Sequence, residues 1–171
     1  MLRDAVSGLR TMVVLAVVAV GLVLAAAWGW HEMTRPFPGK ADAAVCVDTD
    51  VAAGDEVFPA QVVVTVLNAS RREGLAGRTI SALTDEGFAA AGSGNAPKNS
   101  SVKRVQIWTT DPTNPAVQLV ASWLHGPTIV KRATTHPGVV VVVGEGFGEV
   151  SGGRKQVKAT RDTTICSPPV D

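Results

Sequence analysis

Residues 61–70, QVVVTVLNAS, place six apolar or β-branched side chains in succession, from Val62 to Leu67, ahead of three polar or small residues. A short run of this kind is typical of a β-strand that is buried on both faces. The closing Asn-Ala-Ser favours a turn or a helix cap. Apolar and small residues then recur at helical spacing until a glycine ends the pattern. These residues are Leu75, Ala76, Thr79, Ile80, Leu83 and Gly87. The stretch therefore predicts a strand, a helix, and a second extended segment from Phe88.

A second strand–helix unit follows. A loop is expected over residues 92–101, a strand over 105–108, and a helix through 117–124 with its N-cap at Asp111 and Pro112 in the first turn. A short strand at 128–130 and a central strand of five valines at 139–143 complete the pattern. The order β-α-β-β-α-β, with one additional strand before the last, predicts an α/β (α+β) fold. We expect a ferredoxin-like or related two-layer sandwich with both helices on one sheet face.

The N-terminal region carries an uncharged run of nineteen residues, 12–30. This is close to the roughly 20 apolar residues that a helix needs to cross a bilayer. A cleavable signal peptide is the alternative, because Arg3 and Arg10 precede the run and three alanines end at Ala27. The length of the run and the tryptophans that close it favour a retained anchor. We predict a short N-terminal segment (1–11), a transmembrane helix (12–30), and a linker with the start of the domain (31–60).

Two cysteines, Cys46 and Cys166, bracket the rest of the chain. No C-x-x-C spacing indicates redox chemistry, and two cysteines do not make a zinc site. A disulfide that joins the two ends of one domain is the simplest prediction. An anchor and a signal peptide both deliver this domain outside the cytoplasm. We expect a single-pass protein of the cell membrane with an extracytoplasmic C-terminal domain.

Charge and motif content exclude several function classes. From residue 41 onward there are twelve Lys and Arg against thirteen Asp and Glu, a net charge of −1. Nucleic-acid binding is not expected, because it typically needs a basic face. An acidic start and a basic end of the domain predict that these segments lie near each other. We find no motif for a catalytic centre or a metal site, and we expect neither enzymatic activity nor a cofactor.

One loop is a candidate binding site. The turn between the first strand and the first helix contains Asn68, Ser70, Arg71 and Arg72. Amides at a helix start, together with two arginines, favour an anion such as a phosphate. The structural alternative is a capped helix with solvated arginines.

The same segments resemble a known family. The fragments are VVVTVLNAS at 62–70, GLAGRTISALTDEGF at 74–88, SGNA at 93–96 and VVVVVGEGF at 139–147. In this order they resemble the C-terminal domain of LytR-type envelope proteins (LytR_C) over residues 61–147. Residues 148–171 then form a C-terminal extension, tied back by the predicted disulfide. Larger members carry a separate phosphotransferase domain, for which this chain has no room.

A lone domain behind one membrane span is similar to the Cei-like proteins that support envelope integrity in actinobacteria. The resemblance implies a membrane-anchored binding or scaffolding protein of the cell envelope, without enzymatic activity. Expected partners are the membrane itself and envelope proteins, glycopolymers or lipids. The alternative is a carrier or sensor that binds a lipid-linked phosphate or an envelope glycopolymer.

Overall fold

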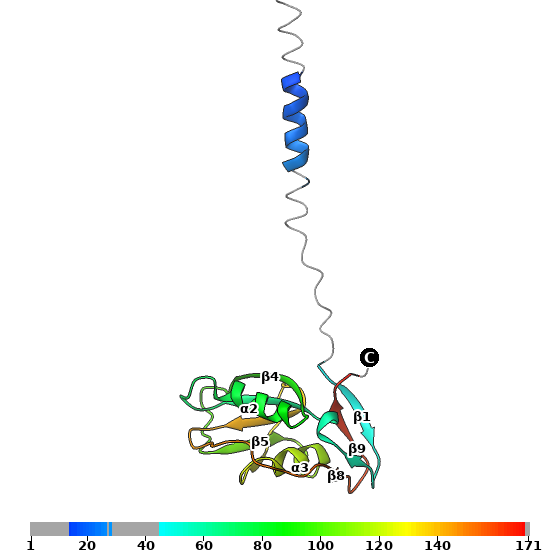
Figure 1. Ribbon diagram of the computed structural model, residues 1–171, viewed down its shortest axis with the longest axis vertical. Helices are drawn as coiled ribbons and strands as arrows, with labels where there is room; N and C mark the ends of the chain where they lie inside the picture. Colours follow the sequence, from blue (N-terminus) through cyan, green and yellow to red (C-terminus); the bar gives the residue numbers. More distant parts are fainter. Residues whose placement is uncertain (1–13, 27, 29–44, 170–171) are drawn as a thin grey trace, which may run out of the picture. The chain divides into compact units, whose positions relative to one another are not determined.

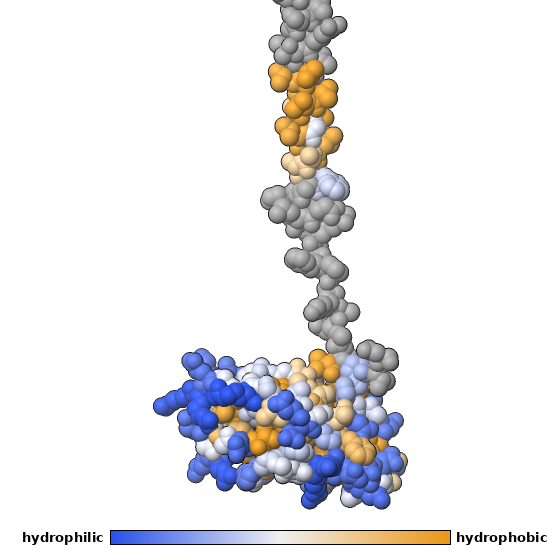
Figure 2. All heavy atoms as spheres, in the orientation of Figure 1, coloured by the Kyte–Doolittle hydropathy of each residue, from blue (hydrophilic) through white to orange (hydrophobic). Residues whose placement is uncertain are grey.

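The computed structural model describes residues 14–26, 28 and 45–169. The chain divides into two compact units, residues 1–42 and 43–171. In the first unit residues 14–26 are helical, and their apolar side chains are exposed (Figure 2). Among the described residues, no helix has both the length and the apolarity that a membrane crossing requires. The predicted span 12–30 includes residues outside the described ones at both ends, so it stays a prediction.

The core of the second unit is a mixed five-stranded sheet in the order β4-β3-β7-β5-β6. Its strands are β3 (Val63–Asn68), β4 (Ala89–Asn95), β5 (Val105–Thr109), β6 (Thr128–Lys131) and β7 (Val139–Val143). β3 is parallel to both β4 and β7, whereas β5 is parallel to β6 and antiparallel to β7. The predicted α/β class and element order are confirmed.

The sheet has a different topology from the ferredoxin-like one. In a ferredoxin-like fold the two strands of each strand–helix–strand unit lie apart, with another strand between them. Here β4 hydrogen-bonds directly beside β3, and β6 beside β5. Consequently β7 fills the centre between the two units, where all five of its valines are buried.

Helices α2 (Leu75–Asp85) and α3 (Pro115–Ser122) pack on the same face of this sheet (Figure 1). The two strand–helix–strand units run in opposite directions and step toward opposite edges. Right-handed crossovers therefore bring both helices to one side. One hydrophobic cluster joins them to alternate residues of the central strands. Its members include Leu75, Leu83, Val117, Leu119, Val64, Ile107 and Val141.

The opposite face of the sheet is covered by loops. Leu67, Trp108, Val140 and Val142 form a second buried cluster there, closed by Val102 from the loop between β4 and β5. The segment before β7 also covers this face, because the buried hydroxyl of Thr65 donates a hydrogen bond of 2.8 Å to the carbonyl oxygen of Pro137.

The two ends of the domain pair with each other. β1 (Val47–Val51) is antiparallel to β9 (Thr163–Ser167), and β2 (Glu56–Val57) to β8 (Val157–Lys158). The 3-10 turn η1 (Pro59–Gln61) then leads into the sheet. The acidic start and the basic end do lie side by side, since Glu56 is opposite Lys158.

The predicted disulfide is present. It joins Cys46 to Cys166 across 120 residues, with the two Cα atoms 5.4 Å apart. The bond lies at one end of the antiparallel β1–β9 pair. The chain that returns to it crosses the end of α3, where the Trp123 indole N–H donates to the carbonyl oxygen of Arg154 at 3.0 Å.

Two sequence predictions about element boundaries are wrong. The N-cap of α3 is Asn114, followed by Pro115, whereas Asp111 forms a turn with Thr113. Both Asp-Pro and Asn-Pro are good helix starts, and the chain uses the second. Residues 92–95, expected as loop, continue β4 because they pair with the end of β3. Backbone pairing outweighs the turn preference of the glycines.

Candidate functional site: a cleft at the ends of β5 and β6

A cleft of about 360 Å³ opens where β5 and β6 end. Because these strands are parallel, the residues that follow them meet at one edge of the sheet. The first residues of α3, strand β9 and the segment from His136 to Val139 form the remaining walls. In open α/β sheets, ligands commonly bind outside the carboxyl ends of the strands. The cleft is therefore the natural candidate site of this domain.

A stacked pair lines the cleft. The Trp108 side chain is 5% exposed, and its indole N–H donates to the Gln106 side-chain oxygen at 2.9 Å. The Arg132 guanidinium carbon lies 4.0 Å from the centre of the Trp108 ring. The Arg132 backbone N–H donates to the carbonyl oxygen of Thr109 at 2.9 Å, which extends the β5–β6 pairing by one residue. The guanidinium is thus positioned both by its backbone and by the ring.

Arg132 also lines a second cavity that shares residues with the cleft. This adjoining cavity of about 300 Å³ is lined by Pro97, Trp108 and the segment that contains Arg132 and His136. Arg132 is therefore a lining residue of both cavities.

Asp111 is the carboxylate of the cleft, and it is already bonded within the protein. One of its oxygens accepts hydrogen bonds from the Thr113 backbone N–H and hydroxyl, and the other accepts from Arg161 at 2.5 Å. The Thr113 hydroxyl and, to a smaller extent, the Arg161 cation lower the pKa of Asp111 below its ordinary value. The ion pair links the β5–α3 loop to the loop before β9.

Asn114 binds the helix to the disulfide-linked strands. Its side-chain oxygen caps α3 by accepting from the Ala116 N–H at 3.0 Å. Its side-chain NH₂ group donates to the carbonyl oxygen of Thr164 in β9 at 2.9 Å. Asn114 therefore fixes the start of α3 to strand β9, and both of these elements line the cleft.

The candidate anion-binding residues lie in a separate loop, after β3. Asn68, Ser70, Arg71 and Arg72 are close together, as expected. The Asn68 side-chain oxygen accepts from both the backbone N–H and the hydroxyl of Ser70, and the Ser70 oxygen accepts from the Arg72 N–H. Helix α2 starts later, with Gly74 as its N-cap. Two of the loop's amides therefore bond to side chains of the loop itself.

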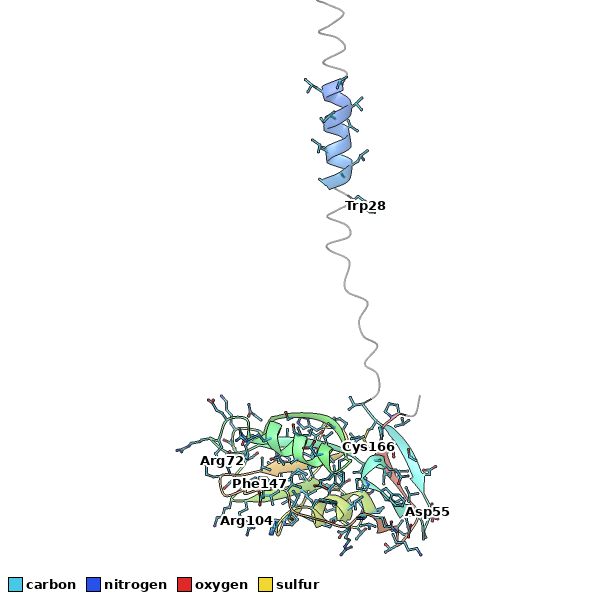
Figure 3. The ribbon with its side chains drawn as sticks, viewed as in Figure 1. Trp28, Asp55, Arg72, Arg104, Phe147 and Cys166 are labelled. Carbon is cyan, nitrogen blue, oxygen red and sulfur yellow. A yellow bond between two sulfur atoms is a disulfide. The ribbon has the colours of Figure 1, made fainter. Side chains whose placement is uncertain are left out.

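The two arginines of this loop differ in their surroundings. The Arg72 guanidinium donates to the carbonyl oxygens of Phe147 and Glu145, at 2.5 and 3.4 Å. The Arg71 backbone N–H donates to the Glu145 carboxylate at 3.1 Å, while the residue itself is exposed. Figure 3 places Arg72 and Phe147 at the end of the domain away from Cys166. Anion binding by this loop stays a prediction, with Arg71 as its free cation among the described residues.

The histidines do not converge. His125 and His136 are both exposed and lie at opposite ends of β6, and His31 is outside the described residues. Within the described ranges, no cluster of three His, Cys, Asp or Glu residues is arranged to hold a metal ion.

A known protein family matches the part of the chain that forms the sheet. The sequence model of LytR_C, described as LytR cell envelope-related transcriptional attenuator, matches residues 61–147. This chain belongs to the LytR_C family. The LytR_C match covers the five strands of the sheet, both helices and the turn that Arg72 contacts.

No curated protein matches the chain. One similar solved structure is the soluble domain (residues 71–217) of a conserved hypothetical secreted protein, an Rv2700 ortholog from Mycobacterium marinum. It is 27% identical, with 59% of this chain and 78% of that chain covered and a TM-score of 0.41.

Sequence reasoning did not single out Trp108 and Arg132. The available signal was weak: a tryptophan at the end of one predicted strand and a Lys-Arg pair at the end of another. Only the parallel pairing of β5 with β6 places these two strand ends together.

Proposed function

We propose that this LytR_C protein is a non-enzymatic binding module of the cell envelope, held outside the cytoplasm, which binds an envelope component in the cleft at the ends of β5 and β6. The Cys46–Cys166 disulfide carries the proposal of an extracytoplasmic location. Such bonds form and persist in oxidising compartments and are rare in the cytosol. The family description, which is cell envelope-related, supports the same location.

The chemistry of the cleft supports binding rather than catalysis. Its cysteine is part of the disulfide, and its carboxylate is paired with Arg161. Its histidine, His136, is exposed. A nucleophile next to a general base would favour an enzyme, and the lining residues lack that pair. A few positioned polar groups beside an aromatic side chain are typical of a ligand-binding site.

The N-terminal run 12–30 supports a role at the membrane. We propose that it anchors the chain, with the domain of residues 43–171 on the outer side. The membrane is then the first partner. The second partner is a protein, glycopolymer or lipid of the envelope.

Photocrosslinking in intact cells tests this function. A photoreactive amino acid replaces Thr110, which is exposed at the cleft. The matched control replaces Ser81, an exposed residue of α2. We expect a crosslinked envelope component from position 110 and not from position 81. Identical products from both positions, or none from either, would reject the cleft as the binding site.

A second candidate function is a carrier or sensor of a lipid-linked phosphate. The exposed Arg71 beside the polar Asn68–Ser70 turn favours it. The full-length protein in detergent is titrated with polyprenyl phosphate, as wild type and as Arg71→Ala. Arg78→Ala, which removes an exposed cation of α2, is the control. Weaker binding by Arg71→Ala alone would support this function, and equal binding by all three proteins would dismiss it.

A further inference from the structure

We propose that Arg132 binds the anionic group of a saccharide, a carboxylate or a phosphate, that enters the cleft. This inference rests on the proposed function, because it names the chemistry of the ligand for the same site. It assigns the anion to the ends of β5 and β6, away from the Asn68–Arg72 loop.

The first support is the fixed position of the cation. A free arginine side chain loses much rotamer entropy when it binds a ligand. Stacking on the buried Trp108 ring at 4.0 Å, together with the backbone hydrogen bond to Thr109, already restricts Arg132. A pre-organised group binds more tightly, because less freedom is lost on binding.

The second support is the charge balance of the cleft. Asp111, the carboxylate among the lining residues, is satisfied by Thr113 and Arg161. No acceptor among residues 45–169 is hydrogen-bonded to the Arg132 guanidinium, although Arg132 lines both cavities. Among the described residues the Arg132 charge is therefore not paired with an anion, and Arg132 borders cavities of about 360 and 300 Å³.

The third support is the geometry of the guanidinium. When one face of the planar group rests on an indole ring, its N–H edges remain available. These edges match the paired oxygens of a carboxylate or a phosphate. The cleft beside them carries the hydroxyl-bearing residues Thr110 and Thr134. Such groups suit the hydroxyls of a sugar better than an apolar chain.

The competing explanation is structural. Arg132 could serve only to cover the indole face of Trp108, since a cation–π contact stabilises the fold by itself. The two explanations differ in what Arg132→Lys and Arg132→Gln do to ligand binding.

Calorimetric titration of the full-length protein in detergent tests the inference. The probes are glucuronate, glucose 1-phosphate and neutral glucose, each up to roughly 10 mM, so that dissociation constants of about 1 mM are within reach. We expect at least one anionic sugar to bind saturably and glucose to bind much more weakly. Preference between glucuronate and glucose 1-phosphate identifies the anion. Arg132→Gln should weaken binding about tenfold or more, and Arg132→Lys should recover only part of it.

The matched control is Lys131→Gln, which removes the same charge one residue earlier at a position outside both cavities. It should leave the affinity within about twofold, as expected for a screened surface charge. Thermal unfolding of each variant shows that it is folded at the titration temperature.

Three results would overturn the inference: no saturable binding of either anion by the wild type, equal affinities of wild type and folded Arg132→Gln, or equal losses in Arg132→Gln and Lys131→Gln. The crosslinking experiment at Thr110 separates this failure from that of the proposed function. A specific crosslink without anion binding rejects only the role of Arg132.

Discussion

The Arg72 guanidinium donates hydrogen bonds to the carbonyl oxygens of Phe147 at 2.5 Å and Glu145 at 3.4 Å. Arg72 follows β3 and Phe147 follows β7, and these two strands are parallel neighbours. One side chain therefore ties together two loops that are 75 residues apart in the chain. Arg72, which the sequence predicts as an anion ligand, instead joins the carboxyl ends of β3 and β7.

Replacement of Arg72 by methionine should lower the free energy of unfolding by about 1–3 kcal/mol, because two backbone carbonyls lose a charged donor. Urea denaturation measures the change. Arg71→Met is the control and should stay within about 0.5 kcal/mol, since the Arg71 contact with Glu145 is made by the backbone. Equal effects of the two substitutions would contradict this role.

Loss of the disulfide should lower the free energy of unfolding by about 4 kcal/mol, because the bond closes a loop of more than about 100 residues. The Cys46–Cys166 separation is 120 residues. Thermal unfolding with and without a reductant measures the effect. The double substitution Cys46→Ala/Cys166→Ala should unfold at the temperature of the reduced wild type and not respond to reductant. A wild type that is insensitive to full reduction would refute the expectation.

Gly144→Ala should be destabilising by about 1–3 kcal/mol, as is typical when atoms are forced into a packed site. A Cβ atom at this position would overlap the backbone carbonyl of Val102. The Gly144 N–H also donates to the carbonyl oxygen of Arg104 at 2.7 Å, so the turn is held in place. Gly148→Ala is the matched control, because its Cβ would meet nothing within 4 Å. If both variants unfold at the same temperature as the wild type, the close approach of Gly144 to the Val102 backbone does not limit stability.

Asp111, which accepts hydrogen bonds from Thr113 and pairs with Arg161, should make stability depend on pH in the acidic range. The folded-state pKa of Asp111 lies below its ordinary value of 3.8, so ionised Asp111 favours the folded state. This contribution is complete above the unfolded pKa and is lost as the pH falls through the lower folded pKa. We expect it to be at most about 1 kcal/mol, because the pair is partly exposed.

Denaturation of wild type and Asp111→Asn between neutral and acidic pH measures this dependence. The wild type should be more stable at neutral pH, and the two curves should converge below the folded pKa. Arg161→Gln should show part of the same change, since the Thr113 hydrogen bonds remain. A constant difference between the curves at all pH values would contradict the assignment.

Most elements of the sheet were predictable, because the signals are local. Five adjacent valines at 139–143 indicate a buried strand wherever they are placed, and all five are buried. Gly87 follows the first helix with φ +95°, a conformation that favours glycine. The boundary errors arose where two local signals competed, at Asp111 and Asn114, or where pairing with β3 overrode turn-forming glycines at 92–95.

The candidate site was much less predictable. Asn68, Ser70, Arg71 and Arg72 are neighbours in the chain, so their proximity required no fold. Trp108 and Arg132 are brought together only by the pairing of β5 with β6. The residues next to Trp108 in the sequence do not indicate a contact with Arg132, and those next to Arg132 do not indicate one with Trp108.

The sequence by itself determined the α/β class, the element order and the membership of LytR_C, and it predicted the disulfide between its two cysteines. The class and the element order follow from periodicity and turn chemistry, and the family follows from the order of the motifs. The disulfide was predicted because the chain contains two cysteines. Only the tertiary structure decided that β7 lies between β3 and β5, that Arg72 holds the turn at Phe147, and that Arg132 stacks on Trp108 beside a cleft. The physical reason is that several valine-rich strands are interchangeable as local patterns. Their neighbours are selected by the packing of the whole core, and that choice places the side chains of the site.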